Sequence, residues 1–221
     1  MDDQAAADVV QGRVNSKHLL WVGVVAPLFI VGLVLIAATI TPDYSHLYHA
    51  VSRLGVDGMA HPAVLNIAMA VYGLLMWVYA YGLYDQLGRD RCARAISVMI
   101  AVHGLGVLVA GILHDDILKP VQTISTEAIA HSTFAVVSYF ALVAAMCVFS
   151  YFVRRSLLWK GFVWFTVVAI MTSMPLLVLF FFKIGSGPGL FQRAGYGIAL
   201  FWVFVVAVRI SWLRRKTANS T

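Results

Sequence analysis

The side chains of this chain that could do chemistry are histidines and carboxylates, and most of the histidines lie within three short segments. These segments are residues 43–61, 114–116 and 127–131. Imidazole nitrogens and carboxylate oxygens bind zinc, and a histidine beside a carboxylate can act as an acid–base pair. The sequence therefore predicts one site of either kind, provided that the fold brings the segments together. The residues concerned are His46, His49, His61, His114, His131, Asp43, Asp57, Asp115, Asp116 and Glu127.

The second and third segments carry the strongest pattern. Glu127 and His131 are four residues apart and share one face of a predicted helix. The loop that carries Asp115 and Asp116 leads directly into this helix. We expect His114, Asp115 and His131 to converge on one pocket as ligands of zinc, although the chain has no H-E-x-x-H motif. A b-type haem held by His114 and His131 is an alternative that these residues leave open.

His103 lies within a long apolar stretch. It precedes His114 by eleven residues, which is three helical turns, so both are predicted to lie on one helix face. At a rise of 1.5 Å per residue, His103 is about 16 Å deeper than His114. Two interpretations remain open: an ionisable group that lines a functional path, or a neutral histidine hydrogen-bonded across a helix interface.

Residues 41–55 are predicted to form a short helix that lies in the membrane interface. Thr41 is typical of a helix N-cap and Gly55 of a residue that ends a helix. This helix would either anchor the chain in the interface or act as a lid that brings His49, Ser52 and Arg53 to the pocket. We favour the lid.

Gln192 and Arg193 fall in the first turn of the last apolar segment. Arg193 could extend to lipid headgroups, or it could pair with a carboxylate. We expect it to pair with Asp115 or Asp116, because an arginine in a thin polar layer with several carboxylates rarely stays alone.

The elements that position these residues are membrane-spanning helices. Of the 221 residues, 61% are hydrophobic and only 12% are charged, and the mean hydropathy is +0.85. Soluble domains carry roughly 25% charged residues, so this chain lacks the polar groups to cover a water-exposed surface. The composition excludes a cytosolic enzyme, a nucleic-acid reader, a disordered regulator and a secreted disulfide scaffold.

Six segments are long and apolar enough to cross a bilayer, which takes about 20 residues of helix. Because these segments are continuously apolar rather than alternating, they predict helices and not barrel strands. The predicted fold is therefore all-α, a bundle of six transmembrane helices. The segments are Leu19–Ile40, Ala63–Leu83, Ala95–Leu113, Ile129–Val153, Phe162–Phe182 and Leu190–Leu213.

Glycines within two of these segments are predicted to permit close helix packing. They are Gly104, Gly106, Gly111, Gly195 and Gly197.

The distribution of Lys and Arg predicts the orientation. Twelve of these sixteen residues fall on the side of the termini and four on the other side, so both termini are expected in the cytoplasm. The four are Arg53, Lys119, Lys183 and Arg193. We expect cytoplasmic tails at residues 1–18 and 214–221, and a single transmembrane domain at residues 19–213.

The order of several short motifs resembles the six-span integral membrane proteins of bacteria and archaea that are grouped as domain of unknown function 998. The motifs are Ser52-Arg53-Leu54-Gly55, Pro62 to Asn66, the aspartate at Asp115 or Asp116, His131, and Gly189 with Gln192-Arg193. The resemblance implies a shared outer site made of Ser52, Asn66, Asp115, His131, Gln192 and Arg193. It also implies a multi-pass protein of the bacterial or archaeal cytoplasmic membrane, with no established activity.

Two classes of function fit these expectations. In the first, the outward-facing pocket binds a lipid or small amphiphile, with enzymatic character as a metal-assisted hydrolase or transferase. In the second, the protein is a transport, sensor or assembly subunit without enzymatic activity. The expected catalytic residues are Ser52, Asp115, His131 and Arg193, the expected ligand-binding residues are His49, Arg53, Asn66, His103 and Gln192, and the expected zinc ligands are His114, His131 and Asp115.

Overall fold

The computed structural model describes residues 14–116 and 124–218, and these residues fold into helices joined by loops. Six of the helices are long and apolar enough to cross a membrane, as the sequence predicts. Arg13 and Lys119, which enter the charge count, lie outside the described residues. The cytoplasmic location of the termini stays a prediction. The helices are α2 (Val22–Thr39, preceded by the 3-10 helix η1, Val14–Trp21), α3 (Pro62–Gln86), α4 (Arg91–Ile112), α5 (Thr126–Val153), α6 (Phe162–Phe181) and α7 (Pro188–Ala218).

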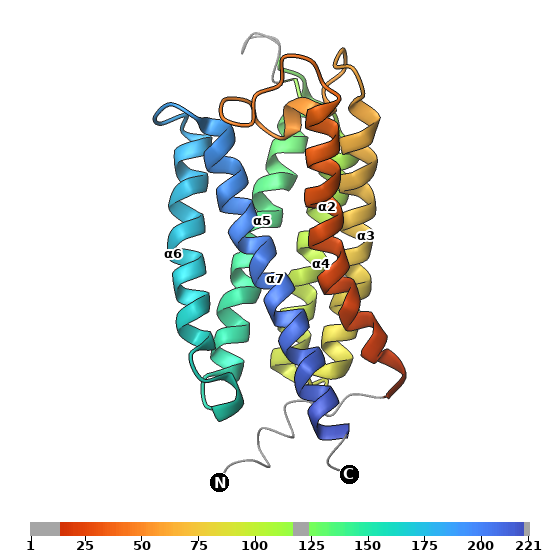
Figure 1. Cartoon of the computed structure of the whole chain (residues 1–221), viewed down its shortest axis with the longest axis vertical. Helices are drawn as coiled ribbons and strands as arrows, with labels where there is room; N and C mark the ends of the chain where they lie inside the picture. The colour runs from red at the N-terminus through yellow and green to blue at the C-terminus, as the bar shows by residue number, and fades with distance from the viewer. Residues whose placement is uncertain (1–13, 117–123, 219–221) are drawn as a thin grey trace.

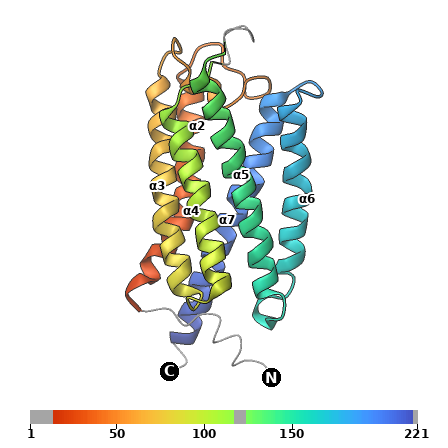
Figure 2. The same cartoon turned by 180° about the vertical axis from the view of Figure 1, so that it is seen from behind.

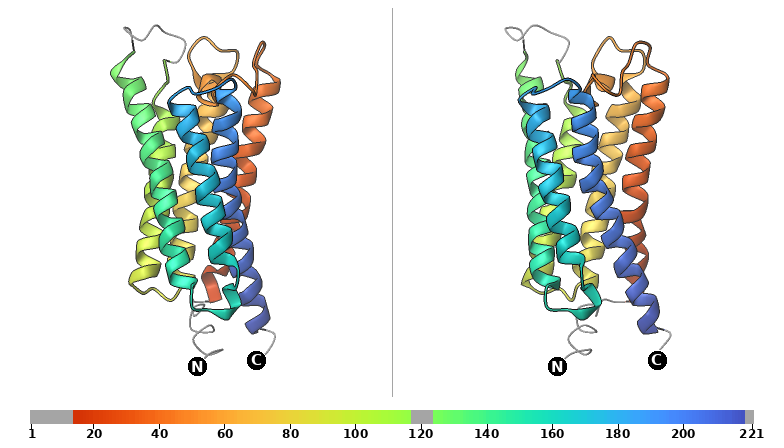
Figure 3. Two further views of the ribbon diagram at one scale, coloured as in Figure 1. Left: turned by 90° about the vertical axis from the view of Figure 1, so that its left-hand side faces the viewer. Right: turned by 60° about the vertical axis from the view of Figure 1, so that its left-hand side comes forward.

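The helices run up and down the bundle in an order that places the first beside the last. Helices α3, α4 and α5 pack side by side along the chain, as Figure 2 shows from behind. Helix α2 packs against α3 and α7, and α6 packs against α7 and α5. In Figure 1, α2 and α7 approach each other near the end of the bundle where α7 finishes, and they diverge toward the opposite end. The right-hand view of Figure 3 shows the same divergence.

Glycines of α4 allow the close packing of α3, α4 and α5. A methyl group added at Gly104 would lie 2.6 Å from the carbonyl oxygen of Gly73, and one added at Gly106 would lie 2.7 Å from that of Phe134. Both distances are too short for carbon against oxygen, so the helices meet backbone to backbone. The predicted packing role of these glycines is confirmed, and Gly111 packs against α3 in the same way.

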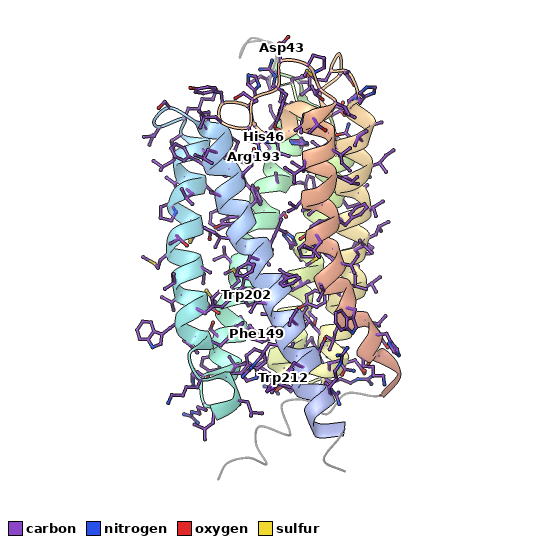
Figure 4. All side chains as sticks on the ribbon, viewed as in Figure 1. Asp43, His46, Phe149, Arg193, Trp202 and Trp212 are labelled. Atoms are coloured by element: carbon purple, nitrogen blue, oxygen red, sulfur yellow. The ribbon has the colours of Figure 1, made fainter. Side chains whose placement is uncertain are left out.

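Aromatic rings fill the half of the bundle nearer the end of α7. The ring of Phe149 lies 5.2 Å from that of Trp159 and 5.5 Å from that of Trp202, both edge to face. The indole nitrogen of Trp202 donates to the hydroxyl of Thr166 at 2.9 Å. Figure 4 labels Phe149 and Trp202 in this half. Large rings in contact leave this half densely packed.

The loop between α2 and α3 is folded differently from the prediction. It consists of turns and a single 3-10 turn, η2 (Ser52–Gly55), instead of a helix over the whole of residues 41–55. Thr41 does not cap a new helix, because its hydroxyl donates back to the carbonyl of Ala37 at 2.7 Å. Asp43 has φ +56°, a left-handed conformation that interrupts a right-handed helix. We call the end of the bundle that carries η2 the η2 end.

Candidate functional site

A pocket of about 390 Å³ lies in the half of the bundle nearer the η2 end. Helices α2, α3, α4, α5 and α7 all contribute to its wall, and Val51 and Ser52 line it at the η2 end. The volume is within the range of small-molecule sites in proteins. Most of its wall is aliphatic, and those residues are Ile30, Val31, Val34, Leu35, Leu65, Met69, Val107, Ala110, Ala135 and Leu200.

The most exposed lining residues lie on α2, and α2 and α7 diverge at this end of the bundle (Figure 1), so we infer that the mouth of the pocket lies between these two helices. On the α2 side, the lining residues Val31 and Leu35 are 43% and 51% exposed. On the α7 side, the lining residue Gly197 faces open space, since a methyl group added there would have no neighbour within 4 Å. The prediction that Gly197 permits close helix packing is therefore wrong, and this glycine instead leaves the mouth of the pocket open. Gly195 does pack closely, against Leu177 of α6.

Gln192 and Ser52 supply polar groups at the η2 end of the pocket. Gln192 is 9% exposed, and its side-chain oxygen accepts a hydrogen bond of 2.6 Å from the backbone nitrogen of Val51. This bond fixes the start of α7 to the chain just before η2. Asn66 of α3 fixes the other side of η2, because its amide donates to the carbonyl of Gly55 at 3.0 Å. A Cβ at Gly55 would collide with the Asn66 side chain. Asn66 thus positions η2.

Arg193 binds the loop before η2, and the predicted pair with Asp115 or Asp116 is wrong. Its guanidinium donates to the backbone carbonyls of His46 and His49, each at 2.8 Å, and to the hydroxyl of Tyr44. Figure 4 labels Arg193 beside His46. The reason is topological: α7 begins beside the loop that follows α2, where the backbone nitrogen of Leu190 donates to the carbonyl of Leu47 at 3.1 Å, whereas Asp115 follows α4. Backbone carbonyls and a phenol take the place that the sequence assigned to a carboxylate.

Tyr44 and His49 lie in the positive field of two arginines. Burial raises the pKa of the Tyr44 phenol, although Arg193 and Arg53 oppose that shift. Burial also lowers the pKa of His49, and Arg53 and Arg193 lower it further. Tyr44 therefore stays a neutral phenol, which donates to the carbonyl of Ala50 at 2.9 Å. The His49 ring favours its neutral form and accepts from the backbone nitrogen of Ser45 at 3.0 Å.

His131 lines the pocket from α5 and lies beside Asp115. Its Nδ1 is 2.8 Å from the carbonyl oxygen of Ala110 and 3.0 Å from that of Leu113, so Nδ1 carries a proton and donates it. Its Nε2 is 4.0 Å from a carboxylate oxygen of Asp115. Both side chains are largely buried, at 9% and 15% exposure. The sequence prediction that these two residues meet is confirmed in geometry.

His114 does not share a helix face with His103, because α4 ends at Ile112 and Leu113 is extended with ψ 132°. Its side chain is 43% exposed, and its Nδ1 is 3.5 Å from Glu127 and 3.8 Å from Asp57. The end of α4 before His114 therefore turns the His114 side chain toward the surface of the bundle.

The three predicted zinc ligands do not form a metal-binding group. Within residues 14–116 and 124–218, no three His, Cys, Asp or Glu side chains are placed to hold one ion. His131 has its Nδ1 on backbone carbonyls, and His114 turns to Glu127 rather than to Asp115. The zinc hypothesis gains no support from this geometry.

His103 forms the deep polar part of the pocket wall and joins three helices. Its Nε2 lies 2.9 Å from the hydroxyl of Tyr72 on α3, and its Nδ1 lies 3.1 Å from the carbonyl oxygen and 2.9 Å from the hydroxyl of Ser138 on α5. The residue is 1% exposed. Since both ring nitrogens have protein partners, the contacts fit a neutral histidine hydrogen-bonded across a helix interface.

Sequence reasoning missed Tyr44, Tyr72 and Ser138 as parts of the site. A helical pattern could have found Ser138, because it follows His131 by seven residues and so lies on the same stripe of α5. Tyr72 had no such signal, since its partner His103 is on another helix. Tyr44 binds Arg193 only because the loop folds back over α7.

Sequence reasoning also missed a buried carboxylate at the other end of the bundle. Asp85, near the end of α3, is 2% exposed and accepts hydrogen bonds from Arg89, Ser16 and Gln86. It is far along α3 from Asn66 and joins η1 to α3. Its spacing from Arg89, four residues, was the available signal.

Comparison with known proteins gives a family without a described activity. No curated protein and no solved structure matches this chain. The family model described as "Protein of unknown function (DUF998)" matches residues 24–209, which include every residue that lines the pocket. The chain therefore belongs to the DUF998 family of proteins of unknown function.

Proposed function

We propose that this integral membrane protein binds an amphiphile of the outer leaflet, with the apolar tail in the pocket and the polar group at the η2 end. The observation that carries the proposal is the distribution of side chains along the pocket. Its wall between α2 and α7 is aliphatic, whereas Ser52, Gln192 and Arg193 are polar and lie at the η2 end. A lipid-like molecule has the same division into an apolar and a polar part.

The dimensions of the pocket suit this ligand. On α7 the lining residues run from Gln192 to Leu200, which is about 12 Å at 1.5 Å per residue. The hydrocarbon core of a bilayer is about 30 Å thick, so the pocket extends through less than one leaflet. With the predicted orientation, the η2 end lies at headgroup level on the outer side. A tail could enter sideways between α2 and α7 without crossing water.

The contacts of His131 favour binding over hydrolysis. In a Ser-His-Asp hydrolase, one histidine nitrogen faces the carboxylate and the other takes the proton of the serine. Here Nε2 faces Asp115 and Nδ1 donates to the carbonyls of Ala110 and Leu113, so neither nitrogen is left for Ser52. The enzymatic alternative requires a rearrangement of His131, whereas binding requires none.

The test is to fill the mouth of the pocket. In Gly197→Phe the new ring enters open space, so the helix tolerates the substitution. The ring then occupies the part of the pocket that the ligand would fill. Gly32→Phe is the matched control, because Gly32 is also a helical glycine with open space around it, on α2, and it does not line the pocket. We expect Gly197→Phe to lose the lipid that wild type and Gly32→Phe retain in neutral detergent, measured by native mass spectrometry. Equal lipid retention by all three proteins would contradict the proposal.

A further inference from the structure

Two arginines lie at the η2 end of the bundle, one of them in the wall of the pocket, and neither has a carboxylate partner in the described part of the chain. Arg193 lines the pocket, and Arg53 follows directly on the lining residue Ser52. The guanidinium of Arg193 donates to the carbonyl of His49, and the backbone nitrogen of Arg53 donates to that of Ala50, so both residues lie at the same loop. An arginine at a membrane boundary is ordinarily paired or exposed to water. This pair therefore creates a local excess of positive charge at the polar end of the pocket.

The two guanidinium groups differ in what they bind. Arg193 uses its terminal nitrogens on Tyr44 and on backbone carbonyls, and its Nε is buried without a hydrogen-bond partner. The side chain of Arg53 makes no hydrogen bond with any residue of the described ranges, and its Nε is likewise buried. A buried donor without a partner costs free energy that a ligand oxygen can recover. Arg193 thus holds the loop, while Arg53 keeps its donors available.

Among the described residues, no carboxylate at this end of the bundle pairs with either arginine, and Asp43, in the loop before η2, is exposed. Asp115 is on the α4–α5 side, beside His131, and Asp57 lies near His114. The side chain that Arg193 contacts is the neutral phenol of Tyr44, and the neutral side chains of Ser52 and Gln192 line the pocket at the same end. An anion on the α7–η2 side would meet positive charge and hydrogen-bond donors.

We propose that the amphiphile carries an anionic headgroup, a phosphate or a carboxylate, which Arg53 binds directly at the η2 end of the pocket. This inference rests on the function proposed above and specifies the ligand. The planar guanidinium of Arg53 offers paired donors that match two oxygens of such a group. The charge of Arg193 adds attraction without releasing the loop. A headgroup without charge would leave the arginine pair uncompensated.

The experiment compares three probes in titration calorimetry of the full chain in dodecyl maltoside. Decyl phosphate has both the tail and the anion, decyl glucoside has the tail with a neutral head, and inorganic phosphate has the anion alone. The variants are Arg53→Gln, Arg53→Lys and the control Lys183→Gln, which removes an exposed cation of the predicted outer side. Because partition into micelles is the same for every variant, differences among the variants report binding to the protein.

We expect Arg53→Gln to weaken decyl phosphate binding about tenfold, as for loss of a hydrogen bond to a charged group, and Arg53→Lys to weaken it less. Lys183→Gln should bind decyl phosphate as wild type does, and decyl glucoside should bind every variant equally. Since the side chain of Arg53 makes no hydrogen bond with the described residues, its variants should keep the wild-type melting temperature.

Three results would overturn parts of this reasoning, and they are distinguishable. Equal decyl phosphate affinity in wild type and Arg53→Gln would contradict the proposal that Arg53 binds an anionic headgroup, but it would leave the proposed pocket intact. Inorganic phosphate binding as tightly as decyl phosphate would show a site for free phosphate and not for an amphiphile. If Gly197→Phe binds decyl phosphate and decyl glucoside as tightly as wild type does, the proposed function itself is contradicted.

Discussion

Arg193 is expected to hold the loop before η2 closed over the end of the bundle, and its replacement gives a measurable prediction. Arg193→Met keeps the length and apolar stem of the side chain but removes the guanidinium. The change breaks three contacts between α7 and the loop: those to the carbonyls of His46 and His49, each 2.8 Å, and that to the Tyr44 hydroxyl. The helices themselves keep all of their backbone hydrogen bonds.

The magnitude follows from these three contacts. Hydrogen bonds to a charged group contribute about 1.5–3 kcal/mol each, and partial exposure to solvent reduces that to about 1 kcal/mol. Loss of all three therefore lowers the free energy of loop opening by about 3 kcal/mol. Because each 1.4 kcal/mol is a factor of ten, amides protected by the closed loop should exchange roughly 150-fold faster.

Hydrogen exchange measured by mass spectrometry tests this directly. The informative amides are those of His49, which donates to Ser45 at 2.9 Å, and of Val51, which donates to Gln192 at 2.6 Å. Lys183→Met is the matched control, because it removes a cation of the predicted outer side that is exposed. Unchanged exchange in the loop of Arg193→Met would refute the reasoning, and so would an equal increase in all helices, which would indicate global destabilisation.

Three further predictions concern packing, a buried hydrogen bond and pH. Gly104→Ala should lower the melting temperature, because its methyl group meets a carbonyl oxygen of α3 at 2.6 Å, at a cost of about 1–3 kcal/mol. Gly197→Ala should not lower the melting temperature, because residue 197 faces open space and alanine favours helix. Tyr72→Phe should destabilise the bundle by about 1–3 kcal/mol in detergent unfolding, because it leaves the Nε2 of buried His103 without its partner; an unchanged unfolding midpoint would contradict this. The pKa of His49 is lowered in the folded chain, so near and below the ordinary histidine pKa of 6.5 the unfolded chain binds more protons than the folded chain. Stability should therefore fall as the pH drops below 6.5. His49→Gln should flatten this part of the profile of melting temperature against pH.

The helices could be predicted from the sequence because a bilayer imposes a simple requirement. A backbone in hydrocarbon must satisfy its own hydrogen bonds, so a long apolar run has one solution. The predicted segment Ala63–Leu83 accordingly lies inside the helical stretch Pro62–Gln86. The predicted segment Leu19–Ile40 extends only one residue beyond the end of the helical stretch Ser16–Thr39. The same requirement gives no information about which helices are neighbours.

The parts of the site that depended on neighbours were harder to predict. His131 and Asp115 were found because only a short stretch of chain separates α4 from α5. The partner of Arg193 was missed because Tyr44 and the carbonyls of the loop are nearly 150 residues away in sequence. His114 was misplaced since one extended residue, Leu113, ends the helical register that the prediction continued.

The mouth between α2 and α7 also determines what a ligand competes with. A pocket that opens into hydrocarbon exchanges its contents with lipid tails rather than with water, and lipid tails are as apolar as leucine. Transfer of a tail from the leaflet to the aliphatic wall therefore yields little net hydrophobic free energy. Selectivity must come from shape and from the polar end, and occupancy follows the mole fraction of the ligand in the leaflet instead of its concentration in water.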